Sequence, residues 1–167
     1  HSDHGYRSDH SNHGNHDEDG RRKSQTLDFS DDDGKEAAAY TYQEVFDTAD
    51  AIALKLQKWG AGCQDRLMLI YPPGIDFIFA FLGCLRAGVV AVPAYPPSPE
   101  RMERDIGRLA GIIKSAGPKF ALTSNTYLRV KRLTSFRYTW PKLDWHATTS
   151  IRGKPGVSPR FEAPQMR

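Results

Sequence analysis

Hydrophobic side chains recur at helical spacing where the patterned part of the chain begins, near Ala37. Thr41 and Glu44 stand at the spacing of a capping box, in which the threonine oxygen accepts from a backbone amide and the glutamate reaches back to the cap. Apolar residues follow at intervals of three and four, and Gly60 stands where a helix would end in a left-handed residue. The pattern predicts an amphipathic helix over residues 41–60.

A strand, a helix and a second strand are predicted next. Residues 66–71 form a continuous apolar run, which is typical of a parallel strand covered on both faces. Ile75–Ala87 is predicted as a buried helix closed by Gly88, and Val89–Val92 as the strand that follows. A strand–helix–strand unit of this kind belongs to a parallel sheet.

A membrane span is an alternative interpretation of this region, because the stretch from Phe77 to Tyr95 is almost entirely apolar. Its length suits a span, but Arg86 stands near its centre, where a charge costs about 2.5–3.5 kcal/mol on insertion scales. Glycine and proline also interrupt it, so we reject a membrane span. Two cysteines that do not form a CxxC pair favour a reducing compartment, and we expect a cytoplasmic protein.

The second half of the pattern continues the alternation of helices and strands. Ser98 and Pro99 are placed to begin a helix that Gly117 ends, with apolar residues on one side and arginines on the other. Residues 119–123 are predicted as a strand, Ser124 as the cap of a short helix, and residues 143–147 as a fourth strand. The fold class is therefore α/β, a partial and mostly parallel sheet with flanking helices over residues 37–150.

The two ends of the chain lack such periodicity. Residues 1–36 are rich in histidine and aspartate and nearly free of apolar side chains, so we expect a disordered tail. Five closely spaced histidines there could bind zinc or nickel, but nothing orients them, and adventitious binding is the favoured interpretation. Residues 151–167 are basic and contain proline, and we expect them to be unanchored. The first residue is His1 rather than methionine, so we expect a piece of a longer protein.

Charge is distributed unevenly along the chain. The formal net charge of +3 hides 10 acidic and 5 basic side chains in residues 1–36, and 4 acidic and 14 basic ones in residues 101–167. A basic region with interleaved aromatics is one sign of nucleic-acid binding. Here the charges fall mostly on the expected solvent side of helices or in the weakly patterned end, and we expect no nucleic-acid partner.

Motifs that carry chemistry are missing from the folded region. Neither a GxxxxGK[ST] phosphate loop, a GxGxxG turn nor a GxSxG nucleophile elbow occurs. His146 has no nucleophile beside it and is interpreted as a packed or surface residue, and Cys84 as a small apolar group of the buried helix. The segment of residues 148–156 resembles an anion loop superficially, but Ile151 and Arg152 stand where small residues are needed.

Several motifs resemble the opening part of fatty acyl-AMP ligases, a branch of the adenylate-forming (acyl-CoA synthetase-like) superfamily. Tyr-Pro-Pro-Gly at 71–74 and Val-Pro-Ala-Tyr-Pro-Pro at 92–97 are more typical of that branch than of the CoA ligases. The resemblance covers about residues 38 to 148. Its other parts are the superfamily's first and second core motifs and two later segments, at 40–45, 85–93, 117–123 and 143–145.

The resemblance implies an enzyme that activates a fatty acid with ATP and Mg²⁺ to an acyl-adenylate and passes the acyl group to an acyl carrier protein, often in polyketide or lipopeptide assembly. It also implies that the phosphate loop, the adenine and ribose contacts and the mobile domain with its lysine lie beyond this chain, in the missing remainder of the domain. We therefore assign no catalytic, cofactor-binding or metal-binding residue and expect the chain alone to be inactive. The alternative is a non-catalytic interaction or scaffold module derived from an adenylation domain.

Overall fold

A four-stranded parallel sheet lies at the centre of the protein. The computed structural model describes residues 25–29 and 38–153. The strands are ordered β4-β3-β5-β6, and each neighbouring pair is parallel. The expected α/β class with a mostly parallel sheet is confirmed. The strands are β3 Arg66–Ile70, β4 Val90–Ala94, β5 Phe120–Thr123 and β6 Trp145–Ala147.

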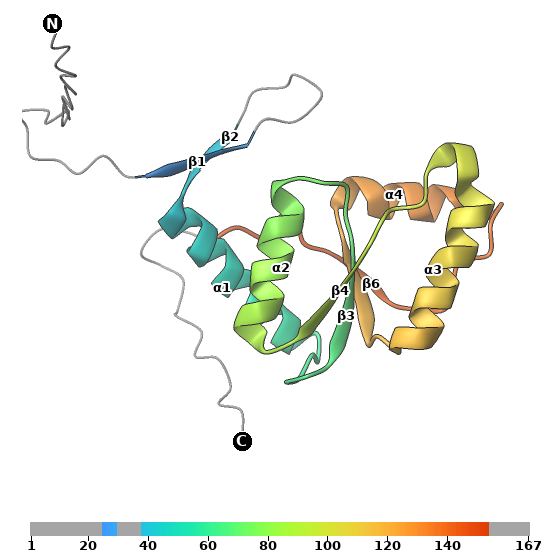
Figure 1. Cartoon of the computed structure of the whole chain (residues 1–167), viewed down its shortest axis with the longest axis horizontal. Helices are drawn as coiled ribbons and strands as arrows, with labels where there is room; N and C mark the ends of the chain where they lie inside the picture. Colours follow the sequence, from blue (N-terminus) through green and yellow to red (C-terminus); the bar gives the residue numbers. More distant parts are fainter. Residues whose placement is uncertain (1–24, 30–37, 154–167) are drawn as a thin grey trace, which may run out of the picture.

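Helices cover both faces of this sheet (Figure 1). On one face, α1 (Tyr42–Lys58) and α2 (Ile75–Ala87) pack against each other, and on the other lie α3 (Met102–Ala116) and α4 (Asn125–Thr134). Successive side chains of a strand point to opposite faces. Leu67 and Leu69 of β3 accordingly join the core under α1 and α2, whereas Met68 and Ile70 join the core on the α3 side.

The predicted helix ends are present in the structure. The Thr41 amide donates to Glu44 Oε2 at 2.8 Å and the Glu44 amide donates to Thr41 Oγ1 at 3.1 Å, which completes the capping box of α1. Gly88 ends α2 in the left-handed conformation, at φ 69°, as its position after a long apolar helix predicts. Ser124 caps α4 by accepting from the Tyr127 amide at 3.1 Å.

The start of the third helix differs from the prediction. A short 3-10 helix, η1 (Pro99–Arg101), precedes α3, with Pro99 in its first turn. Ser98 makes no capping bond, because its amide and its hydroxyl both donate to Asp105 Oδ2, at 3.0 and 3.2 Å. The carboxylate is the stronger acceptor, and it turns the serine hydroxyl into a donor.

β4 continues through Pro93, beyond the predicted end at Val92. The Val90 amide donates to the Asp65 carbonyl at 2.8 Å, toward β3. Because the backbone N–H and C=O groups of successive residues point to alternate sides of a strand, those of residues 91 and 93 point away from β3. β4 is the edge strand, so a proline without an N–H removes no bond of the ladder there.

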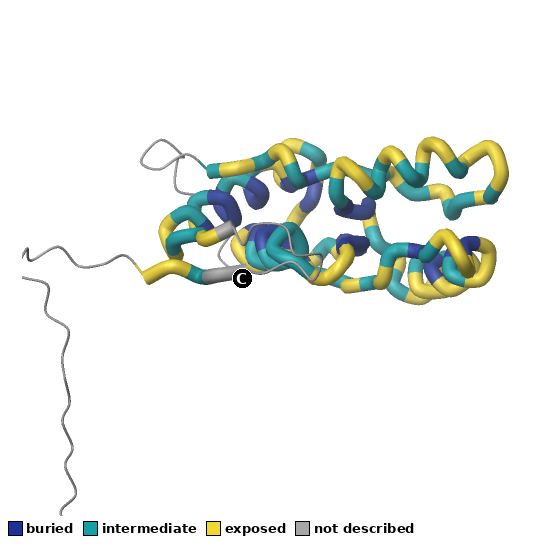
Figure 2. The backbone as a smooth tube through the Cα atoms, turned by 90° about the horizontal axis from the view of Figure 1, so that it is seen from above, coloured by how far each residue is buried: buried dark blue, intermediate teal, exposed yellow. Residues whose placement is uncertain are grey.

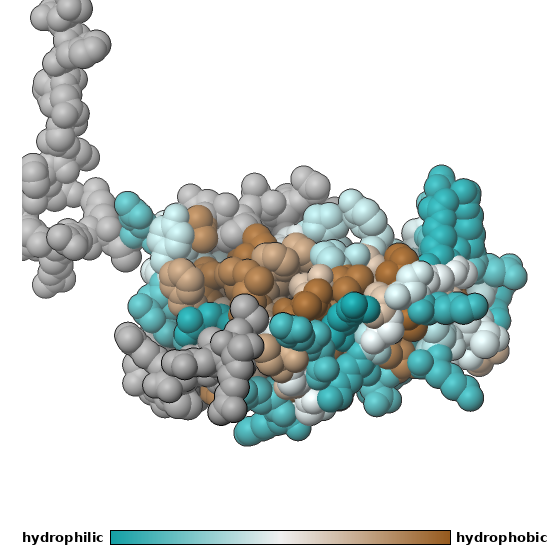
Figure 3. Space-filling view, turned by 60° about the horizontal axis from the view of Figure 1, so that its bottom comes forward, coloured by the Kyte–Doolittle hydropathy of each residue, from teal (hydrophilic) through white to brown (hydrophobic). Residues whose placement is uncertain are grey.

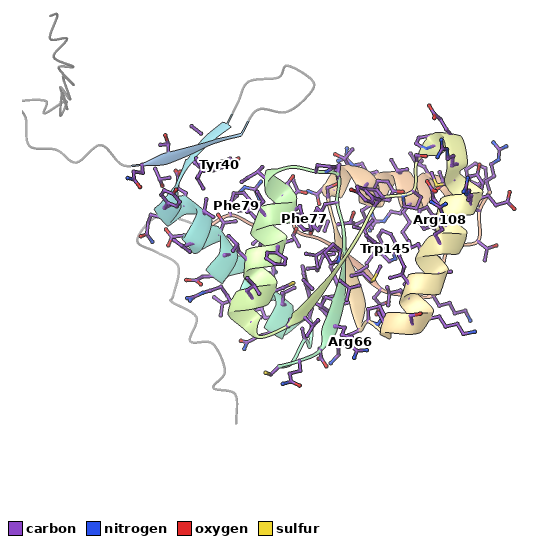
Figure 4. All side chains as sticks on the ribbon, viewed as in Figure 1. Tyr40, Arg66, Phe77, Phe79, Arg108 and Trp145 are labelled. Atoms are coloured by element: carbon purple, nitrogen blue, oxygen red, sulfur yellow. The ribbon has the colours of Figure 1, made fainter. Side chains whose placement is uncertain are left out.

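A two-stranded antiparallel hairpin corrects the expected limits of the disordered tail. β1 (Thr26–Phe29) pairs with β2 (Ala38–Thr41), so residues 26–29 form a strand inside the segment expected to be disordered. Leu27 and Tyr40 pack against the α1–α2 core, and the Tyr40 ring meets Phe79 edge to face at 5.3 Å (Figure 4). Composition averaged over 36 residues conceals a strand this short.

The segment that follows β6 is also better anchored than expected, as far as Gly153. Ile151 packs against the α1–α2 core, Arg152 Nη2 donates to Asp76 Oδ1 at 3.0 Å, and the Gly153 amide donates to Thr48 Oγ1 at 3.3 Å. The expectation of an unanchored end is wrong for residues 151–153. Residues 154–167 and the histidine-rich residues 1–24 lie outside the described part.

Burial follows the three-layer arrangement, with the buried residues in the interior between the helices and the sheet (Figure 2). A band of hydrophobic surface nevertheless crosses one face of the molecule (Figure 3). Phe81 and Leu85 of α2 and Val90 of β4 are exposed by 37%, 56% and 47%, so the outer side of α2 is not covered by the described residues. Among those residues no helix combines the length and apolar character needed to cross a membrane.

Candidate functional site

The carboxyl ends of the parallel strands are where a site is expected in an open α/β sheet. The strand order reverses between β3 and β5, since the chain leaves β3 for β4 on one side and reaches β5 on the other. Tyr71 follows β3 at this edge, Ser124 follows β5, and Thr148 follows β6.

An apolar pocket of about 260 Å³ opens at this edge. Tyr71 and Pro73 come from the loop after β3, Phe77 from α2, and Ala94 from the end of β4. Pro93 and Tyr95 complete the lining. The Tyr-Pro-Pro-Gly and Val-Pro-Ala-Tyr-Pro-Pro motifs are therefore neighbours in space, because β3 and β4 are adjacent parallel strands whose carboxyl ends meet.

Of the two tyrosines in the pocket lining, Tyr71 and Tyr95, the first is engaged internally. Tyr71 is 4% exposed, and its hydroxyl forms a 2.6 Å hydrogen bond with Thr148 Oγ1. Burial raises the pKa of the Tyr71 phenol far above its ordinary value. Thr148 is itself held by its amide, which donates to the Thr123 carbonyl at 3.0 Å. This network fixes the wall of the pocket at Tyr71.

Two helices begin at the same edge, but neither offers an anion site. Asp76 in the first turn of α2 places a carboxylate where a phosphate would bind, and it accepts from Arg152. At the start of α4 the Asn125 amide donates to Thr149 Oγ1 at 3.2 Å, and Ser124 caps the turn. The segment of residues 148–156, for which a phosphate-binding role is not expected, is described only as far as Gly153.

The remaining candidates from the sequence are structural. His146 stacks on Trp59 at a ring distance of 4.2 Å and meets Phe120 edge to face at 4.9 Å, and partial burial lowers its pKa. Cys84 is buried in α2, where desolvation raises its pKa to about 12, and Cys63 is exposed. Within the described ranges no three His, Cys, Asp or Glu side chains come together to hold a metal ion.

The described lining of the pocket can hold an apolar group, and it contains no carboxylate, histidine, cysteine or lysine. The pocket itself was not predicted, although its signal was present in the sequence. The two proline-rich motifs directly follow two strands of one predicted strand–helix–strand unit. That topology alone places them at one edge of the sheet.

Fold and motifs together are those of an N-terminal part of an adenylate-forming enzyme, and comparison with known proteins supports that class. The sequence profile of the AMP-binding enzyme family matches residues 18–157. The chain therefore belongs to the AMP-binding enzyme family, and the resemblance to fatty acyl-AMP ligases is confirmed.

Several known proteins are similar to this chain over most of its length. The medium-chain-fatty-acid–[acyl-carrier-protein] ligase JamA of Moorena producens is 38% identical over 134 residues, which are 79% of this chain and 22% of JamA. The crystal structure of the fatty acid AMP ligase from Legionella pneumophila matches with a TM-score of 0.62 and 33% identity, over 74% of this chain and 20% of that one. Disco-interacting protein 2 homolog B-A of Danio rerio is 30% identical over 116 residues, 66% of this chain and 7% of that protein. The chain thus spans at most about a quarter of the length of these relatives.

Proposed function

We propose that this chain is part of a fatty acyl-AMP ligase, which joins a fatty acid to AMP and transfers the acyl group to an acyl carrier protein. The observation that carries the proposal is the 38% identity to JamA across 79% of the chain. The two motifs on which the resemblance to this branch rests line the apolar pocket. In the reaction, a carboxylate oxygen attacks the α-phosphorus of ATP, and the bond from that phosphorus to pyrophosphate breaks.

The described residues do not fit ATP or Mg²⁺. Mg²⁺ needs carboxylates beside substrate phosphates, and no cluster of acidic side chains exists in the described part. The helix starts at the carboxyl edge are occupied by Asp76 and by the Thr149 hydroxyl. We propose that this chain contributes scaffold and pocket wall, and that the nucleotide is bound by other parts of the whole protein.

Pyrophosphate exchange tests this proposal. The full-length polypeptide that contains this chain should exchange labelled pyrophosphate into ATP only when a fatty acid is added, and mass spectrometry should detect the acyl-adenylate. Residues 1–167 alone should give the background rate. Exchange driven by amino acids but not by fatty acids would contradict the substrate class. Exchange by residues 1–167 alone would contradict the proposal that other parts of the whole protein bind the nucleotide.

A non-catalytic interaction module is the second candidate. The relative from Danio rerio, whose name describes it by an interaction, is the observation that favours it. The test is folding: a module should unfold cooperatively as a soluble monomer. A piece of a larger domain should instead associate through its uncovered α2 surface, where Phe81 and Leu85 are exposed.

A further inference from the structure

The outward side of α4 combines arginines that form no ion pair with a described residue and exposed apolar side chains. Tyr127 stacks on Trp145 at 6.4 Å, Lys131 lies over the rings of Trp140 and Trp145, and Thr134 Oγ1 accepts from Trp140 Nε1 at 3.2 Å. These contacts fix which side of α4 faces the protein. The opposite side, spaced by three and four residues, carries Arg129, Arg132, Leu133 and Phe136, which we call the α4 face.

The apolar side chains of the α4 face are strongly exposed to solvent. Leu133 is 70% exposed and Phe136 is 89% exposed. The turn after the helix keeps Phe136 on this side, since the Arg137 and Tyr138 amides both donate to the Thr134 carbonyl, at 3.0 and 2.9 Å. Arginine and aromatic side chains are enriched at protein interfaces and often supply most of the binding energy.

Charge along the chain segment that carries the α4 face is of one sign. Residues 106–143 contain 8 lysines and arginines and no aspartate or glutamate. Neither Arg129 nor Arg132 forms an ion pair with any described residue. A second copy of this chain would place positive charge against positive charge, whereas an acidic surface would neutralise it.

We propose that the α4 face docks an acidic protein surface, with Leu133 and Phe136 in contact with apolar side chains and Arg129 and Arg132 paired with carboxylates. The identification of that protein as the acyl carrier protein rests on the proposed function. The partner would thus approach from the α3–α4 side of the sheet, which lies opposite α1 and α2 (Figure 1).

Binding of a purified bacterial apo-acyl carrier protein, followed by fluorescence anisotropy, tests the proposal. The apo form cannot accept an acyl group, so the measurement is independent of adenylate formation, and pyrophosphate exchange needs no carrier. Arg129→Glu with Arg132→Glu should weaken binding by about tenfold or more, and Leu133→Ser with Phe136→Ser by about fivefold. All four side chains are exposed, so melting temperatures should not change.

Lys58→Glu with Lys114→Glu is the matched control, because it changes the net charge equally at exposed positions on α1 and α3. This variant should bind within about twofold of the natural chain, and raising the salt toward about 0.15 M should weaken both. Equal losses in the control and the α4 variants would show nonspecific attraction and overturn the proposal.

Other occupants of the α4 face are tested in parallel. Equal or tighter binding of a short single-stranded DNA, or of phosphatidylglycerol vesicles, through the same four residues would overturn the proposal. So would binding that arises only after residues 1–24 are deleted, since the five acidic side chains of that segment would then occupy the face. Loss of binding in the full-length polypeptide would show that the rest of the protein covers α4, and would also overturn it.

Discussion

Single residues determine how closely the two helices of the α1–α2 layer approach. A Cβ atom at Gly83 of α2 would lie 2.5 Å from Ile52 Cγ2 and 3.4 Å from the Ala49 carbonyl oxygen of α1. Both neighbours are fully buried, so neither can move away easily. The absence of a side chain at position 83 is therefore a packing requirement.

Gly83→Ala should lower the free energy of unfolding by about 1–3 kcal/mol, because it overpacks the contact between α1 and α2. Gly111→Ala is the control: that glycine lies inside α3 with nothing within 4 Å of an added Cβ. It should gain about 0.5–1 kcal/mol from reduced backbone freedom. Urea denaturation measures both, and a neutral Gly83→Ala would contradict the packing argument.

The Tyr71–Thr148 hydrogen bond is a second test at this scale. Tyr71→Phe leaves the buried Thr148 hydroxyl without a partner and should cost about 1–3 kcal/mol, and Thr148→Val should cost a similar amount. The double variant should cost clearly less than the sum, because both buried polar groups are then removed. Additive costs in a denaturation cycle would mean that the two hydroxyls are not coupled.

At the scale of elements, β4 shows how a strand can end a sheet. The backbone groups of Ala91 and Pro93 point away from β3, toward the edge that no described strand pairs with. Proline has no N–H, so position 93 offers no donor at that edge. Edge strands blunted in this way resist pairing with other chains. The periodicity of the sequence predicted a strand here but stopped it before Pro93, because only the strand order shows that this proline lies at an edge.

Pro93→Val should increase self-association of the chain in sedimentation velocity, because it restores an N–H at the free edge of β4. Its melting temperature at low concentration should change little, since the bonds to β3 are unaffected. Val90→Ile, which enlarges an exposed side chain of the same strand without adding a donor, is the control. If both variants associate equally, apolar surface rather than the backbone edge is responsible.

For the whole molecule, buried ionisable groups couple global stability to alkaline pH. Burial raises the pKa of Cys84 to about 12 and raises those of Tyr71 and Tyr127 well above 10. The unfolded chain releases these protons first, near pH 9 for the thiol and near pH 10 for the phenols. The unfolded state then binds fewer protons than the native state, so stability falls as the pH rises.

The free energy of unfolding should therefore decline from about pH 9 upward, approaching about 1.4 kcal/mol per pH unit for each group involved. In Cys84→Ala the decline should begin only near pH 10, because the thiol no longer contributes. Denaturant titrations between pH 7 and pH 11 provide the measurement. Identical profiles for the two proteins would show that Cys84 is not protected by burial.

Local patterns along the chain were sufficient to predict the order of the helices and strands and the residues at which several of them begin or end. The capping box of α1, the left-handed Gly88 and the Ser124 cap each depend on residues within a few positions, so sequence spacing encodes them. The motif resemblance likewise identified the family. The β1–β2 hairpin and the anchoring of residues 151–153 were missed, because they depend on contacts with distant residues such as Phe79 and Asp76.

Only the tertiary structure decided which side chains share a site and which surfaces stay open. The strand order brings the motifs after β3 and β4 into one apolar pocket, and it leaves the outward side of α4 charged and not covered by any described residue. The physical reason is that hydrogen bonding and capping act between near neighbours in the chain. Burial, by contrast, depends on which elements the folded sheet places side by side.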